Sequence, residues 1–166
     1  YQSWQDRQLA VNLSVTSILD DEFVDWLTGR LESLADSTLK IYFELSEINV
    51  VRNIETVTAF SRQIRELGHH VGIDHFGKSF SNFGYLKSLQ PEYVKIDQTF
   101  TRELESGNRD AYFFIGSLRS VAHSLDIKVI GEGVETEGQL SMFEELKVDG
   151  FQGYIVEQPV LMTSKF

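Results

Sequence analysis

The sequence has no cysteine, which excludes disulfide bonds, thiolate zinc sites and cysteine nucleophiles. Positive charge is also scarce, because 15 Lys and Arg stand against 25 Asp and Glu and the formal net charge is −10. A protein that binds nucleic acid without sequence preference needs basic surface to release counterions from phosphates, so we expect no direct nucleic-acid binding. No apolar run approaches the ~20 residues that cross a bilayer. What remains is an acidic globular domain with an ordinary 42% of hydrophobic residues.

Strand and helix patterns alternate along all 166 residues, with only two prolines and no low-complexity linker. We expect strands at about 9–14, 39–44, 70–74, 92–97, 126–130 and 151–155. Helices are expected at about 23–34, 54–67, 83–89, 112–125 and 137–146, where apolar residues recur at helical spacing. This alternation predicts a parallel sheet of the α/β class in a single domain spanning residues 1–166.

A polar residue stands where the apolar run of each predicted strand stops: Asn12, Glu44, Asp74, Lys95, Glu132 and Gln152. Glu47 and Glu135 each follow a member of this set by three residues. In a closed (β/α) barrel the carboxyl ends of all strands converge on one face, whereas in an open doubly wound sheet they spread along an edge. Six such residues, with no glycine-rich phosphate-binding fingerprint, favour the barrel.

Each of these residues has a purely structural explanation when it is taken alone. Asn12 suits a turn or a helix cap, and Asp74 suits an Asx turn before a glycine loop. Lys95 and Asp97 fit a solvated pair on one strand face, and Gln152 fits a core amide. Equivalent positions in successive units favour a shared site instead. Its hard oxygen ligands suit Mg²⁺, Mn²⁺ or Ca²⁺, and two such ions can promote in-line attack on a phosphodiester.

Six short motifs occur in order along the chain: 11–14 (VNLS), 43–47 (FELSE), 72–77 (GIDHFG), 94–97 (VKID), 131–135 (GEGVE) and 151–154 (FQGY). Together they resemble the later motifs of the bacterial EAL domain, which binds and hydrolyses cyclic di-GMP. The resemblance covers nearly the whole chain. It implies a TIM-barrel-like EAL fold.

The resemblance also implies a role for each matching residue. Asn12, Glu44 and Asp74 would be ligands of Mg²⁺ or Mn²⁺, and the catalytic residues would be Lys95, beside the attacking water, and Glu132. Glu47 would anchor the loop that follows Asp74, while Glu135 and Gln152 would complete the site. That loop, 75–84, would contact the ligand through Phe76, Gly77, Ser79 and Ser81, and in this family it often lies near a dimer contact.

Two departures from the family pattern affect these implications. The Glu-Ala-Leu motif of the first barrel strand is absent. A barrel typically takes about 250 residues, so we expect an incomplete one of about six of the eight strand–helix units, without the first strands. The second departure is His75, which stands where active members usually carry a second Asp, and the loop after it also differs from the usual Gly-Thr-Gly type.

We therefore expect a catalytically degenerate cyclic di-GMP receptor or regulatory module of a larger bacterial protein. The alternative is an active metal-dependent phosphodiesterase whose remaining site residues lie upstream in the parent chain. A third reading is an interaction scaffold without ligand. The resemblance further implies a homodimer through EAL–EAL contacts, GGDEF or other signalling domains in the parent chain, and a cytoplasmic location beneath an inner-membrane anchor of the parent.

Overall fold

One parallel sheet runs through the computed structural model, which describes residues 8–34, 38–79 and 83–158. Each strand pairs with the next one in the sequence, so the spatial order of the strands equals their chain order. The strands are β1 (Gln8–Asn12), β2 (Lys40–Ser46), β3 (His70–Phe76), β4 (Tyr93–Ile96), β5 (Lys128–Glu132) and β6 (Gly150–Gln152).

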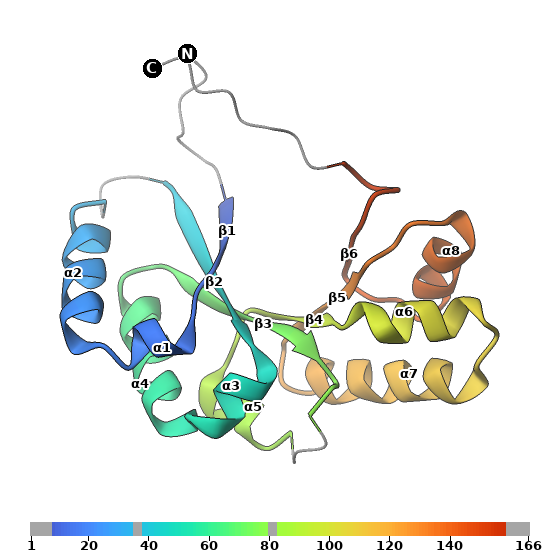
Figure 1. Ribbon diagram of the computed structural model, residues 1–166, viewed down its shortest axis with the longest axis horizontal. Coiled ribbons are helices and arrows are strands. Elements are labelled where there is room, and N and C mark those ends of the chain that lie inside the picture. Colours follow the sequence, from blue (N-terminus) through green and yellow to red (C-terminus); the bar gives the residue numbers. More distant parts are fainter. Residues whose placement is uncertain (1–7, 35–37, 80–82, 159–166) are drawn as a thin grey trace.

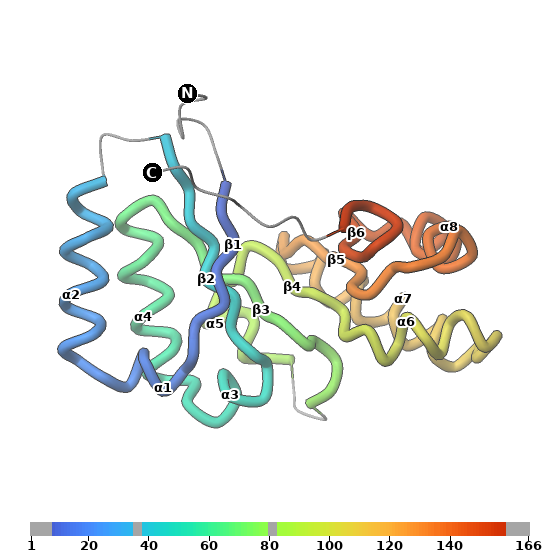
Figure 2. The backbone as a smooth tube through the Cα atoms, turned by 45° about the horizontal axis from the view of Figure 1, so that its top comes forward, coloured from blue at the N-terminus to red at the C-terminus, as the bar shows by residue number. Residues whose placement is uncertain are grey.

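Helices connect the strands and lie on the outer side of the sheet (Figure 1). The first half carries α1 (Val15–Ile18), α2 (Asp21–Glu32), α3 (Glu47–Arg52), α4 (Ile54–Glu66) and α5 (Tyr85–Leu89). The second half carries α6 (Gln98–Glu105), α7 (Arg109–His123) and α8 (Glu137–Glu145). In Figure 2, α2 and α4 lie beside β1 to β3, and α6 to α8 gather around β5 and β6.

The hydrophobic core lies between the outer face of the sheet and these helices. Side chains alternate between the two faces of a strand, so every second residue points outward. The outward residues Leu45, Ile73, Val94, Ile96 and Val129 are all completely buried. Burying them against the helices orients the intervening polar residues toward the inner face of the sheet.

Across the described residues the sheet stays open, because β1 and β6 are its two edges and do not pair with each other. The six strands curl into a half-barrel, which confirms the expected incomplete (β/α) barrel (Figure 2). An open cavity of about 420 Å³ lies on the inner face, and residues of five strands, among them Glu44, Tyr93 and Lys95, line it.

The predicted elements agree with the observed ones except at their ends and at three short helices. The strand predicted from Asp126 begins at Lys128, because Asp126 adopts a positive φ of 59° in the turn after α7. The last strand ends at Gln152, where the chain passes so close to Val134 that Gly153 has no room for a Cβ. Helices α1, α3 and α6, of four, six and eight residues, were not predicted.

No helix within the described ranges is both long enough and apolar enough to cross a membrane.

Candidate functional site

Three carboxylates from three strands surround one buried lysine at the carboxyl end of the sheet. Lys95 of β4 has a side chain that is 4% exposed. Its Nζ lies 3.2 Å from Glu44 Oε2 of β2, 3.6 Å from Asp74 Oδ1 of β3 and 3.9 Å from Glu132 Oε1 of β5. We call Glu44, Asp74, Lys95 and Glu132 the carboxyl-end cluster; its formal charge with all groups ionised is −2.

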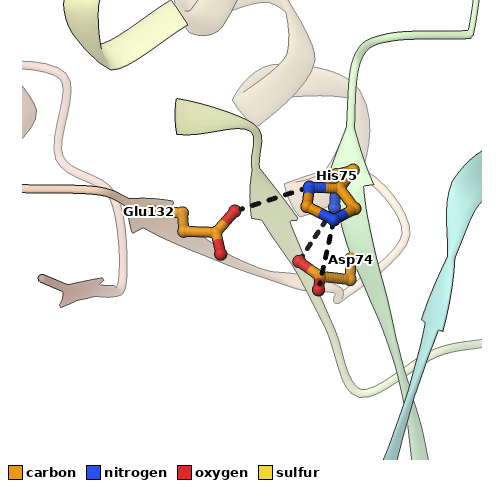
Figure 3. Close-up of side chains that lie close together, drawn as sticks. All are labelled: Asp74, His75 and Glu132. Carbon is orange, nitrogen blue, oxygen red and sulfur yellow. Dashed lines mark hydrogen bonds and ion pairs between the residues drawn. The ribbon is translucent and has the colours of Figure 1, made fainter. Parts of the chain in front are cut away.

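His75 joins this cluster because β3 is irregular there. The pairing of β3 with β4 shifts register between Ile73 and Phe76, and His75 adopts a φ of 57°. In a regular strand two successive side chains would point to opposite faces. The distortion turns both Asp74 and His75 toward Glu132 (Figure 3). A left-handed conformation at a non-glycine residue is uncommon, and Asn, Asp and His adopt it more readily than other residues.

A fully buried aspartate holds the imidazole of His75. Asp97 Oδ2 lies 2.8 Å from His75 Nδ1 and 3.0 Å from Lys78 Nζ, and Asp97 Oδ1 accepts hydrogen bonds from the backbone N–H and the hydroxyl of Thr99. Burial alone would raise the pKa of Asp97. The bonds from Thr99, Lys78 and His75 outweigh it and hold that pKa at about 2. Asp97 is therefore a carboxylate at neutral pH.

Glu132 differs from its neighbours because one of its oxygens has no hydrogen bond to the described residues. Burial raises the pKa of Glu132, and the nearby charge of Asp74 raises it further. Its Oε2 is inaccessible to solvent and makes no hydrogen bond within the described structure. The closest nitrogen of His75, Nδ1, is 3.8 Å away, beyond hydrogen-bond distance. A buried oxygen without a partner is costly, so the site fits an additional cation or donor at this point.

Glu47 fastens the start of the loop that follows β3. It is completely buried, and its carboxylate accepts hydrogen bonds from the backbone N–H groups of Gly77 (3.2 Å) and Ser79 (2.9 Å) and from the hydroxyl of Tyr85 (3.0 Å). Burial raises the pKa of Glu47, and these bonds counteract the rise. The loop therefore leaves β3 in one direction, with Lys78 directed to Asp97.

Comparison with known proteins identifies this arrangement of motifs. The family model described as "EAL domain" matches residues 1–159. The chain belongs to the EAL domain family.

Relatives of this EAL chain are much longer than it. The cyclic di-GMP phosphodiesterase PdeB of Shewanella oneidensis is 28% identical over 163 residues, which are 98% of this chain and 19% of PdeB. The cyclic di-GMP phosphodiesterase PA2567 of Pseudomonas aeruginosa is 31% identical over 93% of this chain and 26% of its own length. The chain thus spans a fifth to a quarter of these curated relatives.

Solved EAL structures share the fold. The PaMucR phosphodiesterase in complex with c-di-GMP superposes with a TM-score of 0.84 at 30% identity, over 95% of this chain and 69% of that one. The c-di-GMP-bound S helix-GGDEF-EAL structure of Vibrio cholerae LapD gives a TM-score of 0.80 at 31% identity, over 90% of this chain and 36% of that one. The expected family and fold are confirmed.

The remaining predicted site residues of this EAL domain stand beside the cluster in the sheet or in the loop after β5. Asn12 pairs in register with Glu44, and Gln152 pairs with Glu132, so both stand at the same end of the sheet. Both are exposed, as is Glu135 in the loop after β5. Within the described residues, no hydrogen bond or ion pair ties these three side chains to the cluster.

The predicted ligand loop is described only in part. Gly77 and Ser79 lie near Glu47, whereas Ser81 lies outside the described residues. Phe76 is completely buried against Phe83 (ring centroids 5.3 Å apart), so the structure places its side chain in the core rather than toward a ligand.

Sequence reasoning missed one residue that touches the cluster directly. The hydroxyl of Tyr93 donates to Glu44 Oε1 at 2.7 Å, and burial raises the pKa of Tyr93. Gly72 makes this contact sterically feasible, because a Cβ there would lie 2.5 Å from the Tyr93 ring. The signal was present in the sequence: Tyr93 precedes Lys95 by two residues and must share its strand face.

Proposed function

We propose that this EAL domain binds cyclic di-GMP at the carboxyl-end cluster, with a divalent cation between the protein carboxylates and the phosphates. The observation that carries the proposal is the convergence of Glu44, Asp74 and Glu132 on Lys95, with Glu132 Oε2 buried and without a hydrogen bond among the described residues. A bound cation inverts the local charge and lets an acidic protein take an anionic ligand. The relatives support this ligand, since PaMucR and LapD are described in complex with c-di-GMP.

The residues present fit a divalent ion. Asp74, His75 and Glu132 each offer one donor atom, and these atoms lie within 4.8 Å of one another. Glu44 and the exposed Asn12 would add oxygen ligands at the same end of the sheet. The ion would neutralise phosphate charge and acidify a bound water. Lys95 would orient that water or hold the charge of the cluster, and Glu132 would exchange protons.

We propose further that the domain is a receptor rather than an efficient hydrolase. Hydrolysis through two metal ions needs bridging oxygen ligands, and a carboxylate next to Asp74 would supply them. His75 instead offers nitrogens, and its Nδ1 is already engaged by Asp97. One ion is sufficient to hold a phosphate, whereas in-line attack benefits from a second ion on the attacking and leaving oxygens.

The test is calorimetric titration of the purified protein with cyclic di-GMP, with and without Mg²⁺ or Mn²⁺, followed by chromatography for a linear product. We expect micromolar or tighter binding and no product. Glu132→Gln should weaken binding, and Lys128→Gln, at the other end of the sheet, should leave it unchanged. No heat and no shift in melting temperature would instead support a scaffold without ligand.

The second candidate is an active phosphodiesterase, favoured by the survival of Glu44, Asp74, Lys95 and Glu132 in one cluster. It predicts steady formation of linear product that Glu132→Ala abolishes. The receptor proposal predicts no product from the unsubstituted protein and a gain of activity in His75→Asp.

We also propose that the domain works within a longer chain. The span of only 19% of PdeB supports further domains, of which GGDEF is one expectation, and upstream strands that close the barrel. A homodimer through EAL–EAL contacts, a cytoplasmic location and a membrane-anchored parent remain predictions. Sedimentation of the purified protein with and without cyclic di-GMP tests the dimer.

A further inference from the structure

The loop that follows β3 presents a lysine at the carboxyl end of the sheet. Lys78 Nζ lies 3.0 Å from Asp97 Oδ2, and 54% of the Lys78 side chain is exposed. Asp97, which directly follows β4, is completely buried. Phe76 and Gly77, which precede the lysine in the loop, are buried as well. Lys78 therefore places a cation on the solvent side of a buried carboxylate.

The backbone that carries this side chain is held in place by Glu47. The buried carboxylate of Glu47 accepts hydrogen bonds from the N–H groups of Gly77 and Ser79, and the N–H of Lys78 also bonds to it. A lysine carries its ammonium on a flexible four-carbon stem. The fixed backbone sets where the stem begins, and the stem lets the ammonium exchange one oxygen partner for another.

Asp97 stays well paired when Lys78 leaves it. Its Oδ2 also lies 2.8 Å from His75 Nδ1, and its Oδ1 accepts hydrogen bonds from the backbone N–H and the hydroxyl of Thr99. The ammonium of Lys78 is exposed, so water or another anion can replace the carboxylate at small cost. The pairs made by Lys95 differ, because the side chain of Lys95 is only 4% exposed.

We infer that Lys78 contacts a phosphate of cyclic di-GMP directly, with its ammonium leaving Asp97 to pair with a phosphate oxygen. The carboxyl-end cluster is formally negative and repels a phosphodiester, and its own cation, Lys95, is enclosed by carboxylates. An exposed ammonium beside the cluster supplies positive charge where the ligand arrives. The inference rests on the proposed function, because it names a protein contact of the same ligand.

The experiment measures the affinity for cyclic di-GMP by calorimetry at fixed Mg²⁺, in about 50 mM and about 500 mM KCl. Lys78→Met should bind about tenfold more weakly than the unsubstituted protein at low salt, because it loses one charge-assisted hydrogen bond. Salt screens exposed charges, so the difference should shrink to within about threefold at high salt. Lys78→Arg keeps the charge and should bind within about threefold of the unsubstituted protein.

Lys128→Met is the matched control, because Lys128 is also exposed (62%) and also pairs with a carboxylate (Glu92, 2.8 Å), at the other end of the sheet. It should leave the affinity unchanged. Both methionine variants should melt within about 4 °C of the unsubstituted protein when no ligand is present, since exposed ion pairs contribute little to stability. A merely structural role of Lys78 predicts instead a lower melting temperature and a loss of affinity that salt does not change.

Equal affinity of Lys78→Met and the unsubstituted protein would overturn the inference and leave the proposed function intact. A loss of affinity that is independent of salt, or that is equally large in Lys128→Met, would also overturn it. Absence of cyclic di-GMP binding by the unsubstituted protein would refute the proposed function and this inference with it.

Discussion

The inner face of the sheet carries two ionic clusters that differ in how completely their charges are paired. The carboxyl-end cluster holds three carboxylates around Lys95 and leaves Glu132 Oε2 without a hydrogen bond in the described parts of the chain. At the amino ends of β3, β4 and β5, Glu92 lies 2.8 Å from Lys128 Nζ and 3.4 Å from His70 Nδ1. We call these three residues the amino-end cluster; here one carboxylate has a cationic partner in Lys128 and a second neighbour in the imidazole of His70, whose pKa burial lowers.

The same strands thus shift the pKa of two glutamates in opposite directions. The hydrogen bond from Lys128 lowers the pKa of Glu92, against a smaller opposing effect of burial. Burial and Asp74 raise the pKa of Glu132 despite Lys95. A carboxylate that is paired with a cation is stabilised in its ionised form. Buried carboxylates that outnumber their cationic partners form a site where an added cation binds favourably. Of the two clusters, the carboxyl-end one alone leaves a buried carboxylate oxygen without a hydrogen bond among the described residues.

The sharpest test of this contrast is Lys95→Met, for which we expect the largest effect. The substitution leaves three partly buried carboxylates without their common cation, and breaking a buried ion pair from one side costs about 3–5 kcal/mol. The free energy of unfolding, from urea denaturation in chelator, should fall by about that amount. Added Mn²⁺ should restore part of it if the carboxylates form the ion site. A loss below about 1 kcal/mol would mean that solvent screens the cluster.

Gly72→Ala tests the packing that joins the clusters, because Gly72 seats the ring of Tyr93 beneath Glu44. The new Cβ would lie 2.5 Å from that ring, and overpacking costs about 1–3 kcal/mol. Gly116→Ala in α7 is the control: its Cβ would meet Leu146 at an ordinary 3.6 Å, and alanine favours a helix by about 0.5–1 kcal/mol. Thermal unfolding should move in opposite directions in the two variants.

The pH dependence of stability tests the support of His75. The pKa of Asp97 is about 2 in the fold, below the about 3.9 of an unfolded chain. Its contribution, about 2 kcal/mol, is therefore present above pH ~4 and lost as pH falls toward 2. Asp97→Asn should remove this loss. Glu47 titrates in both proteins and is not perturbed by Asp97, so its contribution cancels in the difference between their stability–pH curves, and parallel curves would contradict the assignment.

The smallest effect is expected at the amino-end cluster. Lys128 is 62% exposed, so its bond to Glu92 is screened by solvent, and exposed ion pairs contribute about 0.2–1 kcal/mol. Lys128→Met should lower the free energy of unfolding by no more than this and leave cyclic di-GMP binding unchanged. A loss as large as that of Lys95→Met would erase the distinction between the two ends of the sheet.

Much of the site was predictable because the ends of strands can be recognised in a sequence. Glu44, Asp74, Lys95 and Glu132 each stand where the apolar run of a strand stops, and parallel pairing brings such positions together. The contacts of Asp97 and Tyr93 were not predictable in the same way. The partner of Asp97 lies 22 positions away in the sequence, and that of Tyr93 lies 49 positions away. The role of each contact depends on which polar groups have no other hydrogen-bond partner once they are buried.

The sequence by itself determined the α/β alternation, the membership in the EAL family and the set of acidic residues at one end of the sheet, since these follow from local patterns. Only the tertiary structure decided how that set is used. A register shift and a positive φ at His75 bring two successive side chains to one site. Glu132 then directs one oxygen to Lys95, and its other oxygen has no hydrogen bond within the described residues. Both outcomes depend on which groups come within hydrogen-bond reach after folding, and no local pattern of residues encodes that.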